Sequence, residues 1–250
     1  MIPTTLIITT LLGAAAALPT IQSRPQYPPT SKSTGFTLVA NVTYTAKASA
    51  VFNTSVNYWT VVGVHVGAGQ DTAILDPTLH NTFYQNGTKD APDDIHYQND
   101  GLIVDGLSTN PPMSIMLSTL SGTASATLEN GTQYVGINYG YATKGVGIHP
   151  FPDPYPEVYT PNQGTFIVCN ESQPVYGRPQ YPVRFALADT SSGTLEQTVP
   201  DNCVPITLLA QCANLTYVDG NGMEHGTDYT QEVQCYTDVE GIQWGEYRLW

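Results

Sequence analysis

Positive charge is scarce in this 250-residue chain. Its 8 Lys and Arg stand against 21 Asp and Glu, which gives a formal net charge of −13 at pH 7 with neutral histidines. Nucleic-acid binding requires clustered Lys and Arg that neutralise phosphates, and here these residues are few and scattered. The same acidity opposes adsorption to anionic membranes and keeps a released protein in solution. We therefore expect no nucleic acid and no membrane among the partners.

Long apolar runs are also missing. The one apolar stretch lies in residues 1–17, where a threonine-rich segment is followed by small residues, with Ala15 and Ala17 in an A-x-A arrangement. This pattern is typical of a secretory signal peptide and is too short to cross a bilayer comfortably; the alternative is a retained hydrophobic N-terminus. The C-terminal residues Gly245–Trp250 lack the hydrophobic tail of a lipid-anchor signal. The sequence therefore predicts a secreted protein, extracellular or held in the cell wall.

Motifs for catalysis, metal binding and cofactor binding are absent from the sequence. It contains no G-x-S-x-G elbow, no H-E-x-x-H pair and no C-x-x-C, and its five histidines are dispersed. Residues 219–230 fail as an EF-hand loop because the sixth is Glu224, where glycine is required. Most acidic residues stand at turns beside Pro or Gly. We predict no catalytic residue, no metal and no cofactor. A carbohydrate-active enzyme whose carboxylates converge from distant strands stays open as an alternative.

Short strands separated by turns dominate the rest of the chain. Apolar and polar residues alternate in several segments, which is the period of a β-strand, and Asn-Gly pairs such as Asn130-Gly131 favour tight hairpins. The expected strands are Phe36–Thr45, Tyr58–Gly67, Ala73–Asp76, Thr82–Gln85, Leu102–Asp105, Met113–Thr119, Ala124–Leu128, Tyr134–Tyr139, Thr165–Cys169, Val183–Ala188 and Ile206–Ala213. The pattern predicts an all-β fold, either a jelly-roll-like β-sandwich or a closed barrel, with long Pro/Gly-rich loops and little helix.

Composition divides the chain into a leader and a folded part. Residues 18–35 are rich in Pro, Ser and Thr and have little to bury, so they predict a disordered leader. Residues 36–250 are expected to form a single all-β domain, because about 215 residues suffice for one sizeable core. Residues 229–239 fit the period of a helix and that of a strand, so both assignments stay open.

Cysteine is limited to Cys169, Cys203, Cys212 and Cys235. An even number of cysteines in a secreted chain indicates two disulfides, with three possible connectivities. Cys203 and Cys212 flank a strand-like run and can hardly meet each other. We favour the pairs Cys169–Cys203 and Cys212–Cys235.

Six N-x-S/T sequons are candidates for N-glycosylation, which would place them on the surface. Two of them are followed by glycine and have a tight-turn role as the alternative. We expect most of the six to carry glycan in a eukaryotic host. The asparagines are Asn41, Asn53, Asn86, Asn130, Asn170 and Asn214.

The segment His149–Pro161 combines five prolines with three aromatic residues. Proline at this density prevents a central strand and favours an extended loop. The rings of Phe151, Tyr155 and Tyr159 would stack on sugars if exposed, which makes a cell-wall or host polysaccharide a candidate partner. The alternative, which we favour, is that tyrosine–proline packing stiffens a long loop.

Seven blocks of the sequence are distinctive: FTLVANVT, HVGAGQDTAIL, FYQNGT, GTFIVCNE, GRPQYPV, CVPITLLAQC and QEVQCYTDV. Together they resemble a family of secreted fungal proteins catalogued as a domain of unknown function, and the likeness runs from Phe36 to Trp244. Two of the cysteine-containing blocks, in their parts GTFIVC and CVPITL, also resemble PhiA-type conidial cell-wall proteins, where Cys169 and Cys203 would be partners. The resemblance implies a fungal source and an extracellular location, and it supplies no catalytic residue.

The expected function is therefore that of a secreted, N-glycosylated, disulfide-stapled fungal β protein. Its role is expected to be non-enzymatic, at the cell wall or extracellular surface. A carbohydrate-binding module or a carbohydrate-active enzyme is the alternative.

Overall fold

Strands dominate the computed structural model. It describes residues 27–42, 44–87, 101–105, 113–118, 131–140, 142–150, 153, 155–171, 180–189, 194, 196–216 and 230–247. The strands are β1 (Ser31–Ser33), β2 (Gly35–Val42), β3 (Thr60–Gly67), β4 (Gln70–Asp76), β5 (Phe83–Asn86), β6 (Gly101–Val104), β7 (Met113–Ser118), β8 (Thr132–Tyr139), β9 (Gly147–Ile148), β10 (Val158–Tyr159), β11 (Gly164–Cys169), β12 (Val183–Asp189), β13 (Glu196–Gln197), β14 (Cys203–Ala213), β15 (Thr230–Gln231) and β16 (Val233–Cys235). The helices in these ranges are α1 (Thr45–Phe52) and a 3₁₀ turn, η3 (Trp244–Glu246). The predicted all-β class with little helix is confirmed.

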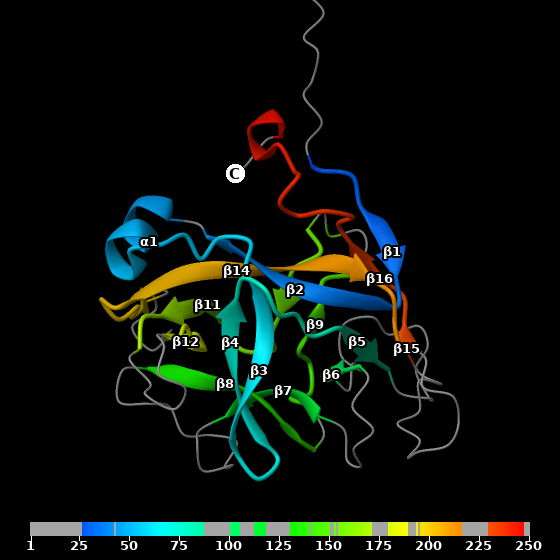
Figure 1. Cartoon of the computed structure of the whole chain (residues 1–250), viewed down its shortest axis with the longest axis horizontal. Coiled ribbons are helices and arrows are strands. Elements are labelled where there is room, and N and C mark those ends of the chain that lie inside the picture. Colours follow the sequence, from blue (N-terminus) through cyan, green and yellow to red (C-terminus); the bar gives the residue numbers. More distant parts are fainter. Residues whose placement is uncertain are drawn as a thin grey trace, which may run out of the picture.

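Eight strands close into a barrel (Figure 1). In the order of hydrogen-bonded neighbours they are β2, β14, β11, β12, β8, β7, β6 and β5, and the pairing of β5 with β2 closes the barrel. The β3–β4 hairpin connects β2 to β8 a second time. Of the two predicted architectures, the chain therefore adopts the closed barrel, which pairs strand edges that a sandwich leaves open.

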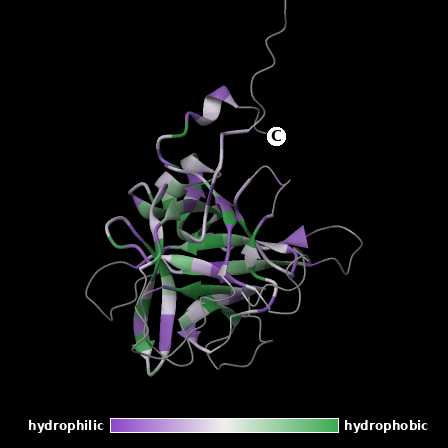
Figure 2. Ribbon diagram, turned by 90° about the vertical axis from the view of Figure 1, so that its right-hand side faces the viewer, coloured by the Kyte–Doolittle hydropathy of each residue, from purple (hydrophilic) through white to green (hydrophobic). Residues whose placement is uncertain are grey.

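The longest ladder of the barrel joins β14 to β2. Residues 206–213 of β14 pair in antiparallel register with residues 42–35 of β2. Alternate side chains, such as Phe36, Leu38 and Leu208, point into the barrel core and are almost fully buried. Burying a side chain of this size stabilises the fold by about 1.5–3 kcal/mol. The hydrophobic residues in Figure 2 accordingly gather on the barrel strands.

The strand predicted over Phe36–Thr45 extends too far. Val42 is the last residue of β2, and its backbone N–H donates to the side-chain Oδ1 of Asn57 at 2.8 Å. Helix α1 follows, because its alanine-rich sequence has high helix propensity. Ala48 and Phe52, one turn apart, face the core.

The first and last strands lie side by side, although they are far apart in the sequence. Strand β1 is antiparallel to β16, with Ser31 opposite Cys235, and Nζ of Lys32 lies 3.1 Å from Oε1 of Glu232. The disordered leader expected over residues 18–35 therefore ends too late, because β16 supplies backbone partners for its last residues. Of the open region 229–239, strands β15 and β16 place residues 230–231 and 233–235 in strand.

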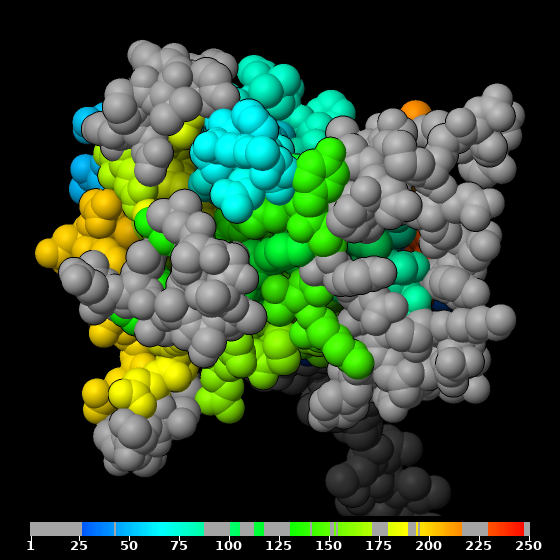
Figure 3. Space-filling model, turned by 90° about the horizontal axis from the view of Figure 1, so that it is seen from below, coloured from blue at the N-terminus to red at the C-terminus, as the bar shows by residue number. Residues whose placement is uncertain are grey.

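The far end of the barrel presents the β3–β4 hairpin, which Figure 3 shows in cyan beside green residues. The backbone N–H of Tyr139 donates to the carbonyl of Gly69 at 2.9 Å. Gly69 has a φ of +67°, and a Cβ there would lie 2.0 Å from the Tyr139 ring. Glycine is therefore required, and it allows the hairpin to pack against β8.

The predicted strand Ala124–Leu128 lies outside the described residues.

Within the described part of the chain, no helix is long and apolar enough to cross a membrane.

Candidate functional site

Two disulfides fasten β14 at both ends. Cys169 of β11 is bonded to Cys203 (S–S 2.05 Å), and Cys212 is bonded to Cys235 of β16 (S–S 2.00 Å). This is the connectivity that the sequence favours, and it leaves no free cysteine. The bonds span 34 and 23 residues of sequence. In the chain-entropy model each stabilises the fold by about 3–4 kcal/mol.

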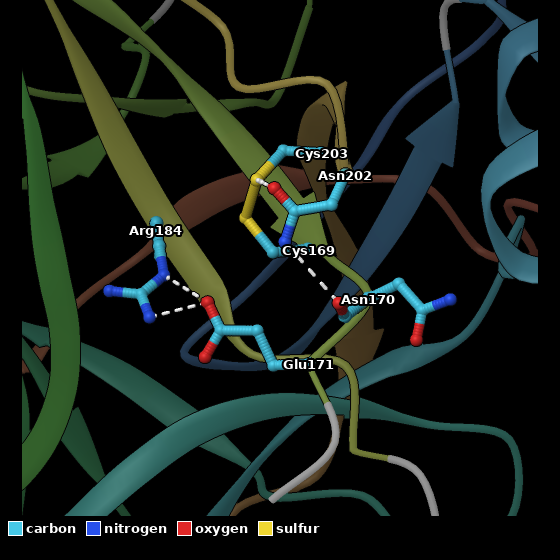
Figure 4. Close-up of a disulfide and its surroundings, with 6 residues drawn as sticks. All are labelled: Cys169, Asn170, Glu171, Arg184, Asn202 and Cys203. Atoms are coloured by element: carbon cyan, nitrogen blue, oxygen red, sulfur yellow. Dashed lines mark hydrogen bonds and ion pairs between the residues drawn. A yellow bond between two sulfur atoms is a disulfide. The ribbon is translucent and has the colours of Figure 1, made fainter. Parts of the chain in front are cut away.

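An ion pair lies beside the first disulfide (Figure 4). Nε of Arg184 donates to Oε1 of Glu171 at 2.9 Å, and the guanidinium carbon lies 4.1 Å from the centre of the Tyr134 ring. The Arg184 side chain is 8% exposed and that of Glu171 is 22% exposed. Because the charge of Arg184 is compensated by the carboxylate and the ring, this group serves to hold the end of β11 against β12 and β8.

Three sequon asparagines leave their side chains accessible to different degrees. Asn53 and Asn214 are exposed, and Asn41 is half-buried on β2. Asn53 ends helix α1 in the left-handed conformation, with φ of 54°, which favours Asn and Gly over other residues. Asn130 lies outside the described residues.

The other two sequon asparagines are built into the fold. Nδ2 of Asn170, the atom to which a glycan would be attached, donates to the backbone carbonyl of Val51 at 2.7 Å. Oδ1 of Asn86 is buried and has no hydrogen-bond partner within the described ranges. A glycan on Asn170 has to replace the contact with Val51, so the six sequons are not equivalent.

The proline–aromatic segment lies along β14, at the edge opposite β2. The N–H of Ala210 donates to the carbonyl of Pro156 at 2.8 Å, and the carbonyl of Ala210 accepts from the N–H of Tyr236 at 2.9 Å. Glu157 forms a β-bridge with Leu209. This strand edge therefore brings Glu157 and Tyr236 together, although they are distant in the sequence.

The predicted sugar-stacking rings in this segment already contact other rings. Tyr155 meets Tyr27 edge to face, with centroids 5.2 Å apart, and Tyr159 lies 5.0 Å from the ring of His149. Both tyrosines are half-buried. Phe151 lies outside the described residues. Two of the three predicted rings are thus each in contact with a neighbouring ring.

A polar cluster around the buried Tyr236 connects the proline–aromatic segment with the C-terminal residues. We call Tyr155, Glu157, Tyr236 and Trp244 the Tyr236 cluster. Tyr236 is 1% exposed, and its ring meets that of Trp244 edge to face, with centroids 5.9 Å apart. The hydroxyl of Tyr236 and Nε1 of Trp244 are both buried and lack a hydrogen-bond partner in the part of the chain that the structure describes. Buried donors are almost always paired in folded proteins, so these two stand out.

The electrostatics of the Tyr236 cluster favour uncharged forms. Burial raises the pKa of Glu157, and the negative charge of Asp153 raises it further. Burial likewise raises the pKa of Tyr236, with smaller contributions from Tyr155 and Glu157. Outside the cluster, Oδ2 of Asp153 lies 2.8 Å from Nδ1 of His149. The cluster is therefore suited to hydrogen bonding with a neutral group.

The described residues offer little for metal binding or acid–base catalysis. No group of three or more His, Cys, Asp and Glu among them could hold a metal ion. Asp153 and Glu157 are two carboxylates of one segment, and the charge of Asp153 raises the pKa of Glu157. However, Asp153 is engaged by His149 and Glu157 is half-buried beside β14. Hydrogen bonding is the chemistry that this arrangement supports best.

Sequence reasoning missed Tyr236 and Trp244. Their partners come from β14 and the proline-rich segment, and no spacing rule connects them to Glu157. The one local signal is a pair of aromatic residues near the chain end, after a cysteine that has to be cross-linked.

The barrel, its two disulfides and the absence of a metal cluster among the described residues define a disulfide-linked β-barrel protein. The chain belongs to a family described as a domain of unknown function, DUF7907, whose model matches residues 33–212. It is 33% identical over 226 residues to antigenic protein SchS34 of Stachybotrys chartarum, which covers 89% of this chain and 95% of that protein. No solved structure matches the chain. The resemblance to a family of unknown function is thereby confirmed.

Proposed function

We propose that this is a secreted, N-glycosylated fungal protein with a non-enzymatic role at the cell wall or extracellular surface. The observation that carries the proposal is the use of all four cysteines in two disulfides. Disulfides of this kind persist in oxidising compartments outside the cytosol and are rare inside it.

Three further observations support an extracellular role. Residues 1–17 have the pattern of a secretory signal peptide. The acidic, lysine-poor composition keeps a released protein in solution. The relative from Stachybotrys chartarum is named an antigenic protein, and antigens of a fungus are met most readily when they are exported. The likeness to PhiA-type conidial proteins supports the cell wall as the site of action.

Glycosylation is proposed to be selective. Asn53 and Asn214 are exposed and can carry a glycan without moving other residues. The side chain of Asn170 is held by its hydrogen bond to Val51, and Oδ1 of Asn86 is buried. We therefore expect that, among the described sequons, Asn53 and Asn214 carry the glycans.

The test is expression from the protein's own N-terminus in a filamentous fungus, followed by fractionation into medium, wall and cytosol. We expect the protein in the medium or the wall, without free thiols, and with a mass that falls on endoglycosidase treatment. Recovery in the cytosol as a full-length chain with four free thiols and no glycan would contradict the proposal.

A further inference from the structure

The Tyr236 cluster contains two donors that the described part of the fold leaves unused. The hydroxyl of Tyr236 both donates and accepts, and the indole N–H of Trp244 donates only. Both atoms are buried in the structure. A buried donor without a partner is costly, whereas the same donor is favourable once an acceptor reaches it. The pair therefore indicates a position for an acceptor supplied from outside the chain.

The cluster connects to the protein surface through the proline–aromatic segment. Its own Tyr155 and Glu157 are half-buried. Next to them, the side chains of His149 and Asp153 are 33% and 48% exposed. Groups of the proline–aromatic segment that reach solvent thus stand next to the cluster, on the side from which a larger ligand would approach it.

Charge decides the class of ligand. Asp153 and the overall net charge of −13 repel an anion. A metal ion needs more ligands than the described residues provide here. An organic cation gains little, because Oδ2 of Asp153 already lies 2.8 Å from Nδ1 of His149 and burial raises the pKa of Glu157. Compared with an anion, a metal ion or an organic cation, a neutral ligand therefore fits the cluster best.

Shape narrows the choice further. The rings of Tyr27 and Tyr155 hold each other edge to face, as do those of Tyr236 and Trp244. Aromatic rings with polar edges suit a ligand that alternates apolar C–H faces with hydroxyl groups. Sugars of a polysaccharide have this character, and their hydroxyls accept hydrogen bonds as well as donate them.

We infer that the Tyr236 cluster binds a sugar residue of a neutral polysaccharide, with its hydroxyls accepting from the Tyr236 hydroxyl and the Trp244 indole N–H. The inference rests on the surface role proposed above and names the partner class for it. It also moves the centre of the sugar site from the rings of Tyr155 and Tyr159, predicted from sequence, to buried groups beside them. Glu157 lies next to the bound sugar as a further hydrogen-bonding group.

The experiment uses the purified full-length secreted protein and two neutral probes, laminarihexaose and chitohexaose, with oligogalacturonate as the anionic control. The indole N–H resonance of Trp244 is followed in ¹H–¹⁵N spectra and is assigned by its loss in Trp244→Phe. We expect at least one neutral probe to shift this resonance in a saturable manner, and oligogalacturonate to leave it unchanged. If neither neutral probe moves it at millimolar concentration, or if oligogalacturonate binds as well, the inference is wrong.

Two variants separate the site from the rest of the barrel. Tyr236→Phe keeps the ring and removes the hydroxyl, so it should weaken binding about tenfold, as expected for one lost hydrogen bond to a neutral group. Trp59→Phe is the matched control, because Trp59 packs against Tyr181 elsewhere on the barrel. This variant should bind the neutral probes with the same affinity as the wild type. Equal affinity for Tyr236→Phe and the wild type would refute the assignment. Binding is measured on purified protein, so a negative result leaves the secretion proposal to its own fractionation test.

Discussion

Removing the two disulfides one at a time should destabilise the barrel by different amounts. The double variants are Cys169→Ala with Cys203→Ala, and Cys212→Ala with Cys235→Ala. The bonds span 34 and 23 residues of sequence. In the chain-entropy model these spans correspond to about 3.8 and 3.4 kcal/mol at 25 °C. Loop length alone therefore hardly distinguishes the two bonds.

Burial distinguishes them. Cys169 and Cys203 are both fully buried and pack in one apolar cluster with Ile167. Of the second pair, Cys235 is fully buried and Cys212 is half-buried. Each fully buried sulfur leaves a small cavity that costs about 1 kcal/mol. The first variant should thus lose about 6 kcal/mol and the second about 4 kcal/mol.

Urea denaturation with linear extrapolation measures both free energies of unfolding. Wild-type protein in the same buffer, without reductant, is the reference, and both variants should show larger m-values because the denatured chain is no longer kept compact by the bond. A loss below about 1 kcal/mol in both variants, or a larger loss for the Cys212–Cys235 pair, would refute the reasoning from loop closure and burial.

Three further predictions concern ionisable groups and glycans. Glu157→Gln should stabilise the protein more at pH 7 than at pH 4. Burial raises the pKa of Glu157 in the folded state. The stability that this group contributes is therefore complete below its ordinary pKa of 4.5 and is lost as the pH rises through the folded-state pKa. Denaturation at the two pH values checks this, and equal effects at both would contradict it. Glu171→Gln should cost about 3 kcal/mol, because it leaves the buried Arg184 guanidinium without its carboxylate; an unchanged urea midpoint would show that the pair contributes nothing. Asn53→Gln should remove one N-glycan from the fungal product, and Asn170→Gln should remove none; intact mass spectrometry decides, and the opposite pattern would overturn the assignment by exposure.

The barrel strands were predictable because their patterns are local. The alternation around Phe36 and that of β14 show directly which residues enter the core, and Asn-Gly pairs indicate turns. Helix α1 was missed because eight residues give too short a pattern and its two core contacts, Ala48 and Phe52, resemble isolated apolar residues. Strand β1 was missed for another reason. Its partner, Val233–Cys235, lies at the other end of the chain, and short polar strands acquire their conformation from such pairings.

The candidate site could be predicted only in part. The proline–aromatic segment is visible in the sequence, and spacing excludes the disulfide connectivity that joins Cys203 to Cys212. Which groups in the segment matter depends on β14, because both backbone groups of Ala210 are used to position Pro156 and Tyr236. No sequence pattern reports that the hydroxyl of Tyr236 is buried without a partner in the described chain, since burial there results from packing by the C-terminal segment.

The same dependence connects the second disulfide to the proposed sugar site. Cys235 directly precedes Tyr236, and its bond to Cys212 anchors that residue beside β14. Two backbone hydrogen bonds, from Cys212 to Tyr236 and from Tyr236 to Ala210, remain when the sulfurs are removed. Removing this bond should therefore weaken laminarihexaose or chitohexaose binding while the barrel still folds. Removing the Cys169–Cys203 bond at the other end of β14 should leave the affinity of the folded fraction unchanged, because it touches none of the cluster. Titration of both double variants under conditions where circular dichroism shows them folded compares the two, and equal affinities would refute the anchoring role of Cys212–Cys235.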